Sequence, residues 1–141
     1  AELWETRLSV SKLLSKSVLV EGQVKAISLD SQEDPFRSYD RMVFDLSLSS
    51  RITNNWSVDI GSRYEYSTYG REESFFIDEF DEEISAPARK DHTLKVYVNN
   101  SLRINPSITL HGKIDSTRRG SNYEEFDYDH YVLSAGITLN F

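Results

Sequence analysis

The side chains best suited to chemistry recur at every second position of one segment, as His111, Lys113 and Asp115. Such spacing puts them on one face of a β-strand, and Asp45 and Asp59 fall in the same phase of two other segments. Imidazole and carboxylate groups together can perform acid–base catalysis. One interpretation of these residues is therefore a barrel enzyme such as an outer-membrane protease or lipase. The spacing establishes no serine–histidine–acid grouping, so we predict no enzyme and no catalytic residues. We interpret these charges as a mixed-charge wall that faces water.

A second group of carboxylates lies between residues 72 and 83, where seven side chains offer oxygen ligands to a cation such as Ca²⁺. The segment lacks the ordered ligand spacing and the glycine of a dedicated calcium loop. We therefore expect a solvated loop, no metal site and no cofactor. The chain has no cysteine, which excludes disulfides and thiolate metal sites. Its net charge of -7 argues against a nucleic-acid partner.

The elements that position these side chains are strands, because apolar and polar residues alternate along most of the chain. Met42, Phe44, Leu46 and Leu48 form one such series, and Tyr131, Leu133, Ala135, Ile137 and Leu139 form the last. The alternation predicts seven strands, at roughly 3–14, 17–29, 41–52, 56–68, 92–104, 107–117 and 129–141.

The connections between these strands are of two kinds. Three are very short, at residues 15–17, 53–55 and 105–107, and three are longer and polar, at residues 30–40, 69–91 and 118–128. Because the two kinds alternate strictly, all short turns belong at one end of the sheet. In an outer-membrane barrel the short turns are periplasmic and the long loops extracellular.

The class of protein follows from what each phase of the strands carries. No run of about 18 apolar residues exists, so a transmembrane helix is excluded, whereas a membrane-spanning strand needs only about 9–11 alternating residues. The polar phase carries charges that we expect to face a lumen: Lys25, Asp45, Asp59, Arg63, Lys95, His111, Lys113 and Asp115. Aromatic residues near strand ends are expected to form the girdles at the two lipid–water boundaries: Trp56, Tyr64, Tyr66, Tyr131 and Phe141.

We thus predict an all-β, antiparallel up-and-down transmembrane β-barrel in a bacterial outer membrane. The alternative is a soluble β-barrel binding module, in which the aromatic residues pair across strands.

The end of the sequence supports the membrane interpretation. Ser134, Gly136, Leu139 and the final Phe141 resemble the terminal β-signal of outer-membrane proteins. This resemblance implies that the barrel assembly machinery is a partner.

A broader resemblance covers residues 40–141. The segments Arg89-Lys90-Asp91-His92-x-Leu94, Ser121-Asn122 and Phe126-x-Tyr128-Asp129-His130, with the closing strand, resemble the C-terminal hairpins of putative β-barrel porins of bacterial exopolysaccharide export. The resemblance implies a barrel of more than seven strands.

The strand count also bears on domain organisation, because single-chain bacterial barrels usually have an even number of strands. The segment Phe75-Phe76-Ile77 is a candidate eighth strand, but it runs into acidic residues that would be costly against lipid. We therefore expect residues 1–141 to be a single β-barrel domain or the C-terminal portion of a larger barrel that begins after an extracellular loop. The rival is an eight-stranded barrel with one strand unidentified.

The expected function is a passive pore or export conduit for polar solute or polysaccharide. The alternative is a structural barrel that acts as a sleeve or anchor for a partner protein or surface assembly, without transport of its own. Outer-membrane lipid and lipopolysaccharide are the expected surroundings, and the Arg118-Arg119 pair is a candidate contact for lipid phosphates. Further chain segments or a partner protein would complete or fill the barrel.

Overall fold

The computed structural model describes residues 2–31, 38–70, 73–77 and 82–140, with the side chains of 73–77 and 82–86 left aside. Nearly all of the described chain is β-structure. Seven long strands form one sheet: β1 (Glu2–Ser15), β2 (Val18–Asp30), β3 (Tyr39–Arg51), β4 (Trp56–Tyr69), β7 (Lys90–Asn105), β8 (Ile108–Ser121) and β9 (Tyr128–Leu139). A 3₁₀ helix, Glu124–Phe126, precedes β9.

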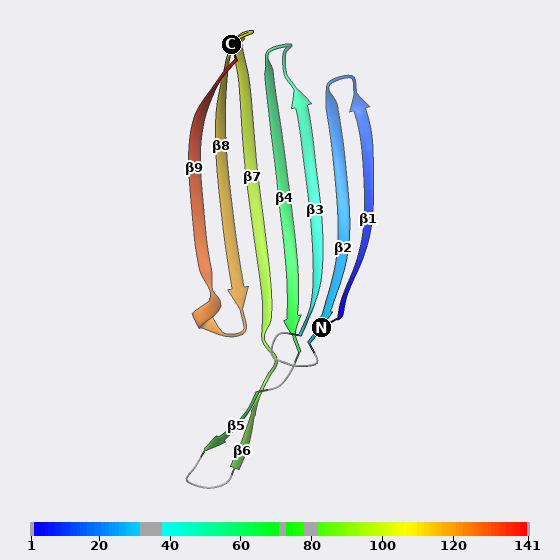
Figure 1. Ribbon diagram of the computed structural model, residues 1–141, viewed down its shortest axis with the longest axis vertical. Helices are drawn as coiled ribbons and strands as arrows, with labels where there is room; N and C mark the ends of the chain where they lie inside the picture. Colours follow the sequence, from blue (N-terminus) through cyan, green and yellow to red (C-terminus); the bar gives the residue numbers. More distant parts are fainter. Residues whose placement is uncertain (1, 32–37, 71–72, 78–81, 141) are drawn as a thin grey trace.

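The seven strands follow one another across the sheet in chain order, and every neighbouring pair is antiparallel (Figure 1). This is an all-β, up-and-down meander, as the alternation predicts. The sheet is not closed: within the described residues, β1 and β9 are its two edges and do not pair with each other.

The three short turns, which Figure 1 places together at one end of the sheet, use the same local device. In each, a side-chain oxygen two residues earlier accepts a hydrogen bond from a backbone N–H. The pairs are Ser17 to Ser15 at 3.3 Å, Asn55 to Thr53 at 3.2 Å and Ser107 to Asn105 at 2.9 Å. Short polar side chains of this kind favour turns over continued strands, so the predicted positions of the turns are confirmed.

One predicted loop is wrong in part. Residues 69–91 contain a separate two-stranded hairpin, β5 (Glu73–Ile77) with β6 (Glu82–Ala86). β5 includes the Phe75-Phe76-Ile77 segment, whose aromatic and β-branched residues favour extended structure. It pairs only with β6 and is therefore not an eighth strand of the large sheet. Residues 72 and 78–81 of the acidic segment 72–83 lie outside the described residues.

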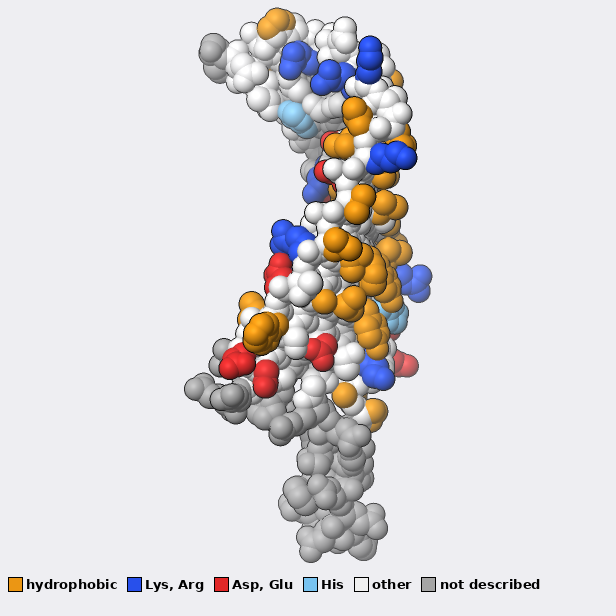
Figure 2. Space-filling model, turned by 90° about the vertical axis from the view of Figure 1, so that its right-hand side faces the viewer, with side chains coloured by type: hydrophobic (Ala, Val, Ile, Leu, Met, Phe, Trp, Pro, Cys, Tyr) orange, Lys and Arg blue, Asp and Glu red, His pale blue; other side chains and the backbone are white. Residues whose placement is uncertain are grey.

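The sheet has two chemically different faces, and nothing in the described part of the chain forms a second layer on either. It is curved, and hydrophobic side chains gather along the bulging, convex side (Figure 2). Val43, on the concave face, is the single buried hydrophobic residue in the described ranges, whereas convex residues such as Leu46 (58% exposed) and Leu133 (80%) are largely uncovered. A soluble sheet normally buries its apolar face against another layer. In this sheet the apolar face is the convex, uncovered one.

No helix in the described part of the chain is both long and apolar enough to span a membrane.

Candidate functional site

The eight charged residues that the sequence assigns to a lumen all lie on the concave face. The strand register shows this, because residues paired across strands point to the same side. Asp45, Arg63 and Lys95 form one row across β3, β4 and β7. The remaining five lie in neighbouring rows of the same face: Lys25, Asp59, His111, Lys113 and Asp115.

Acids and bases pair along this face. The Arg63 guanidinium donates two hydrogen bonds to Asp45, with Nε–Oδ1 at 2.6 Å and Nη2–Oδ2 at 3.1 Å. Glu65 Oε1 lies 3.9 Å from Arg63 Nη1 and 3.7 Å from Lys95 Nζ, so the pairing continues across three strands. Since these side chains are partly exposed, each pair contributes at most about 1 kcal/mol to stability. Their main effect is to fix charges along the wall.

The edge nearest β1 carries a similar group. Glu5 forms ion pairs with Lys25 at 3.1 Å and with Arg7 at 2.9 Å.

The histidine that opened the acid–base hypothesis is not paired with an acid. His111 Nε2 hydrogen bonds to Thr138 Oγ1 at 2.9 Å, while the Asp115 carboxylate is engaged by Lys113 Nζ at 2.8 Å. Among the residues that the structure describes, no three histidine, aspartate or glutamate side chains are grouped as metal ligands. The arrangement therefore places fixed charges and hydrogen-bonding groups on this face, without a paired histidine and acid among the described residues.

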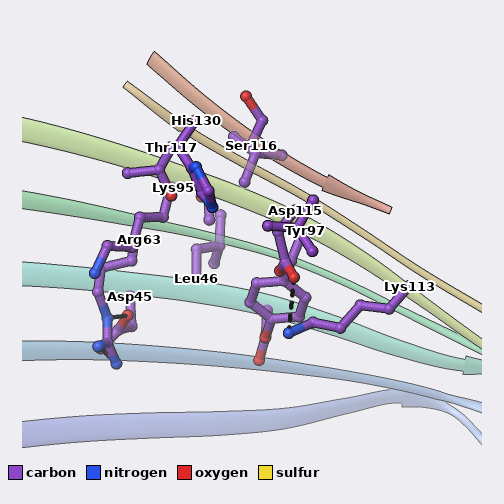
Figure 3. Close-up of a pocket in the computed structure, with 14 residues that line it drawn as sticks. Asp45, Leu46, Arg63, Lys95, Tyr97, Lys113, Asp115, Ser116, Thr117 and His130 are labelled. Atoms are coloured by element: carbon purple, nitrogen blue, oxygen red, sulfur yellow. Dashed lines mark hydrogen bonds and ion pairs between the residues drawn. The ribbon is translucent and has the colours of Figure 1, made fainter. Parts of the chain in front are cut away.

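A hollow of about 560 Å³ lies on the middle of this face. Figure 3 shows the Asp45–Arg63 and Lys113–Asp115 pairs on either side of the Tyr97 ring. The charged and hydrogen-bonding side chains that line it are Asp45, Arg63, Lys95, Tyr97, Lys113, Asp115, Thr117 and His130. Three cations thus face two carboxylates, and Lys95 has the most distant ionic partner of the three.

Tyr97 covers Gly61 of the neighbouring strand. A Cβ built on Gly61 would overlap the Tyr97 ring, so the ring can lie against the sheet only because this position has no side chain. An aromatic residue placed over a strand glycine shields its backbone and fixes the local register. Sequence reasoning does not identify this pair, because it depends on which residue of β7 lies opposite Gly61.

This packing predicts coupling between the two positions. Gly61→Ala is expected to destabilise the protein by about 1 kcal/mol, because the ring must move off the sheet. In a Tyr97→Ala background the same change should cost almost nothing. Urea unfolding of the two single variants and the double variant measures the coupling. Equal costs in both backgrounds would show that the ring does not rest on Gly61.

A second cluster, also not predicted, lies at the long-loop end of the concave face. The Asp91 side chain is 4% exposed, and its carboxylate pairs with Arg119, with Arg89 at 3.3 Å and with the Ser121 hydroxyl at 2.7 Å. The Arg89 guanidinium lies between two rings, 3.7 Å from the Tyr69 centroid and 4.3 Å from that of Phe126. We call these residues the rim cluster.

Hydrogen bonds extend the rim cluster into the adjoining loops. The Tyr123 hydroxyl donates to the Pro87 carbonyl at 2.6 Å, and the Asn122 amide donates to the Ala88 carbonyl at 3.1 Å. These contacts join the chain before β7 to the chain before β9. The mouth of the concave face is therefore built by long-range contacts that no local motif encodes.

The predicted girdle residues in the described ranges lie on the convex face. Trp56 is near the short turns and donates its indole N–H to Asn100. Tyr64, Tyr66 and Tyr131 lie toward the long loops, with Tyr131 74% exposed. Phe141 lies outside the described residues. Trp4, which sequence reasoning placed only in a strand phase, is a further exposed convex aromatic residue.

The proposed assembly-signal residues lie in β9, an edge strand of the sheet. Ser134 and Gly136 face the concave side, opposite Lys113 and His111, and Leu139 faces the convex side. The final Phe141 is again outside the described ranges.

Arg118 and Arg119 do not act as a pair, because consecutive strand residues point to opposite faces. Arg119 belongs to the rim cluster on the concave side. Arg118 lies on the convex side, where its side chain is 82% exposed. The two arginines therefore do not form one site, and the expectation that they contact lipid phosphates stays a prediction.

Comparison of the chain with protein-family models, characterised proteins and solved structures finds no match. The functional argument therefore depends on the two faces of the sheet.

Proposed function

We propose that this sheet is a section of an outer-membrane β-barrel whose concave face lines a passive conduit for polar solutes. The convex face supplies the main support, because its apolar residues form a band with charged residues at its borders. Such a band faces lipid in membrane barrels, while the opposite face is polar and borders water.

The course of the band is the observation that carries the proposal. On β1 the band begins, at the long-loop side, with Trp4. On β3 it begins with Met42, level with Thr6, and on β7 with Leu94, level with Leu8. On β9 it begins with Tyr131, level with Val10. The border therefore shifts along the strands by six residues from β1 to β9, although on β8 the first apolar residue, Ile114, is level with Lys12.

A border that crosses the strands obliquely lies parallel to the membrane plane only if the strands are tilted from the membrane normal. Six residues at about 3.3 Å each, over six strand spacings of about 4.8 Å, correspond to a tilt of roughly 35°. Strands of outer-membrane barrels tilt by about 35–45° from the membrane normal. A band flattened by this tilt fits a bilayer, whereas burial against a protein layer demands no such regular course.

The directions of the edge strands constrain how such a wall closes. In an up-and-down sheet of seven strands, β1 and β9 run the same way. Direct β1–β9 pairing, or a head-to-tail ring of identical sheets, would therefore join parallel strands. An odd number of further strands between the two edges would keep every pair antiparallel, so the proposed barrel is larger and even-numbered.

The proposed function is tested by reconstituting the whole barrel in planar bilayers. Discrete conductance steps are expected. Lys95→Glu should shift the permeability toward cations by about threefold or more, because the hollow then holds two cations and three carboxylates. The matched control is Lys12→Glu, on the convex face near a short turn, which should leave selectivity unchanged.

Silence in the bilayer with a co-purifying partner protein would instead favour the sleeve or anchor. Selectivity that responds to Lys12 and not to Lys95 would contradict the assignment of the concave face as the conduit wall. Dispersal without detergent would contradict the membrane barrel itself.

A further inference from the structure

Charged residues lie on the convex face at the long-loop border of the apolar band. Most acidic and basic ones lie on different strands, but Asp129 of β9 lies directly opposite Arg118 of β8. The acidic residues Glu2, Asp30 and Asp40 lie on β1, β2 and β3. The basic residues Lys90 and Arg118, with His92 between their levels, lie on β7 and β8. Figure 2 shows basic side chains beside the lower end of the hydrophobic band.

The register places His92 beside Arg118, while Lys90 lies two residues from His92 on the same strand. His92 pairs with Gly120, and Arg118, two residues along the same face, pairs with Leu94. Diagonal neighbours of this kind are about 7–8 Å apart, a distance that long side chains bridge. The His92 ring lies against Gly120, where a Cβ would overlap it. This packing keeps the imidazole low on the sheet between the two longer cations.

Neither cation is strongly engaged by protein. The Arg118 guanidinium has one carboxylate nearby, that of Asp129 at 3.8 Å, and both side chains are more than half exposed. The Lys90 side chain forms no ion pair within the described part of the chain. Exposed cations at the edge of an apolar surface fit a ligand that is apolar at one end and anionic at the other.

We propose that Lys90 and Arg118, with His92, form a binding site for the phosphates of lipopolysaccharide. Its acyl chains would lie along the apolar band, on the short-turn side of these residues. This inference rests on the proposed function, in which the long-loop end faces the outer leaflet. Guanidinium and ammonium groups form strong charge-assisted hydrogen bonds with phosphate. Leu94 and Val96 follow His92 on the convex face of β7, toward the short turns. Both are exposed and continue the apolar surface that the acyl chains need.

The test measures lipid A binding to the detergent-solubilised barrel by native mass spectrometry. Bisphosphorylated lipid A should bind at least about tenfold more tightly than lipid A stripped of both phosphates. The double variant Lys90→Gln/Arg118→Gln should abolish that preference. Lys12→Gln, which removes a convex cation at the opposite border, is the matched control and should keep it.

Inorganic phosphate at millimolar concentration distinguishes the two sources of the anion. If it fails to displace lipid A, the site needs the acyl chains; full displacement would overturn the lipid assignment. Equal binding of the two forms of lipid A, or an unchanged preference in the double variant, would also overturn it. Channel conductance, measured in bilayers of lipid without phosphate groups, tests the proposed function separately. Either proposal can therefore fail while the other stands.

Discussion

Replacement of Leu46 by arginine is expected to destabilise the protein in a bilayer by about 2–4 kcal/mol, the cost of a charged side chain at the midplane of a barrel's lipid face. Leu46 lies near the middle of the convex band on β3 and is 58% exposed. If the convex face met water, a cation there would be harmless. The stability of this variant therefore distinguishes a convex face that meets lipid from one that meets water. Urea-induced unfolding from phospholipid vesicles measures the change.

The matched control is Ser47→Arg, one residue further along the same strand. Ser47 faces the concave side, in a row with Gly61 and Tyr97, where the proposed conduit holds water. A cost below about 1 kcal/mol is expected there. Similar costs for the two variants, or a larger cost for Ser47→Arg, would show that the convex face does not meet lipid.

The strands and their faces were predictable from the sequence because both are local properties. The period-2 pattern determines which residues share a face, and short polar residues such as Asn105 and Ser107 mark the turns. These features place the charges Asp45, Arg63 and Lys95 on one face, and the strand register then brings them into one row. The predicted strand ends differ from the observed ones by a few residues, chiefly at β8, which continues to Ser121. There Arg118 and Arg119 look like loop residues in the sequence but extend the strand.

The hairpin β5–β6 and the rim cluster were not predictable in the same way. The run Phe75-Phe76-Ile77 lacks alternation, so its sequence gives no face and no partner. Arg89 and Arg119 lie thirty positions apart, and only the β7–β8 register and the fold of the loop before β9 bring both to Asp91. The alternation within the seven strands also does not specify whether or how the two edges of the sheet are joined.

The rim cluster gives the second large expected effect. Asp91→Asn should lower stability by about 2–3 kcal/mol, because it removes the carboxylate that neutralises two arginines while leaving both in place. The side chain of Asp91 is 4% exposed, but those of Arg89 and Arg119 retain 26% and 23%. Water therefore relieves part of the cost, and the estimate lies below the about 3–5 kcal/mol typical of a fully buried pair.

Asp115→Asn is the control for this change, since Asp115 also pairs with a cation but is 28% exposed. Its expected cost is about 0.5 kcal/mol, as for other solvent-exposed ion pairs. Adding Arg119→Gln to Asp91→Asn should recover part of the lost stability, because one unpaired charge is then removed. Urea unfolding of the wild-type protein, Asp91→Asn, Arg119→Gln and the double variant in one detergent gives the coupling energy. Additive losses would mean that Asp91 and Arg119 contribute independently, and that the loops at the mouth are held by the Arg89 ring contacts and the Tyr123 and Asn122 hydrogen bonds instead.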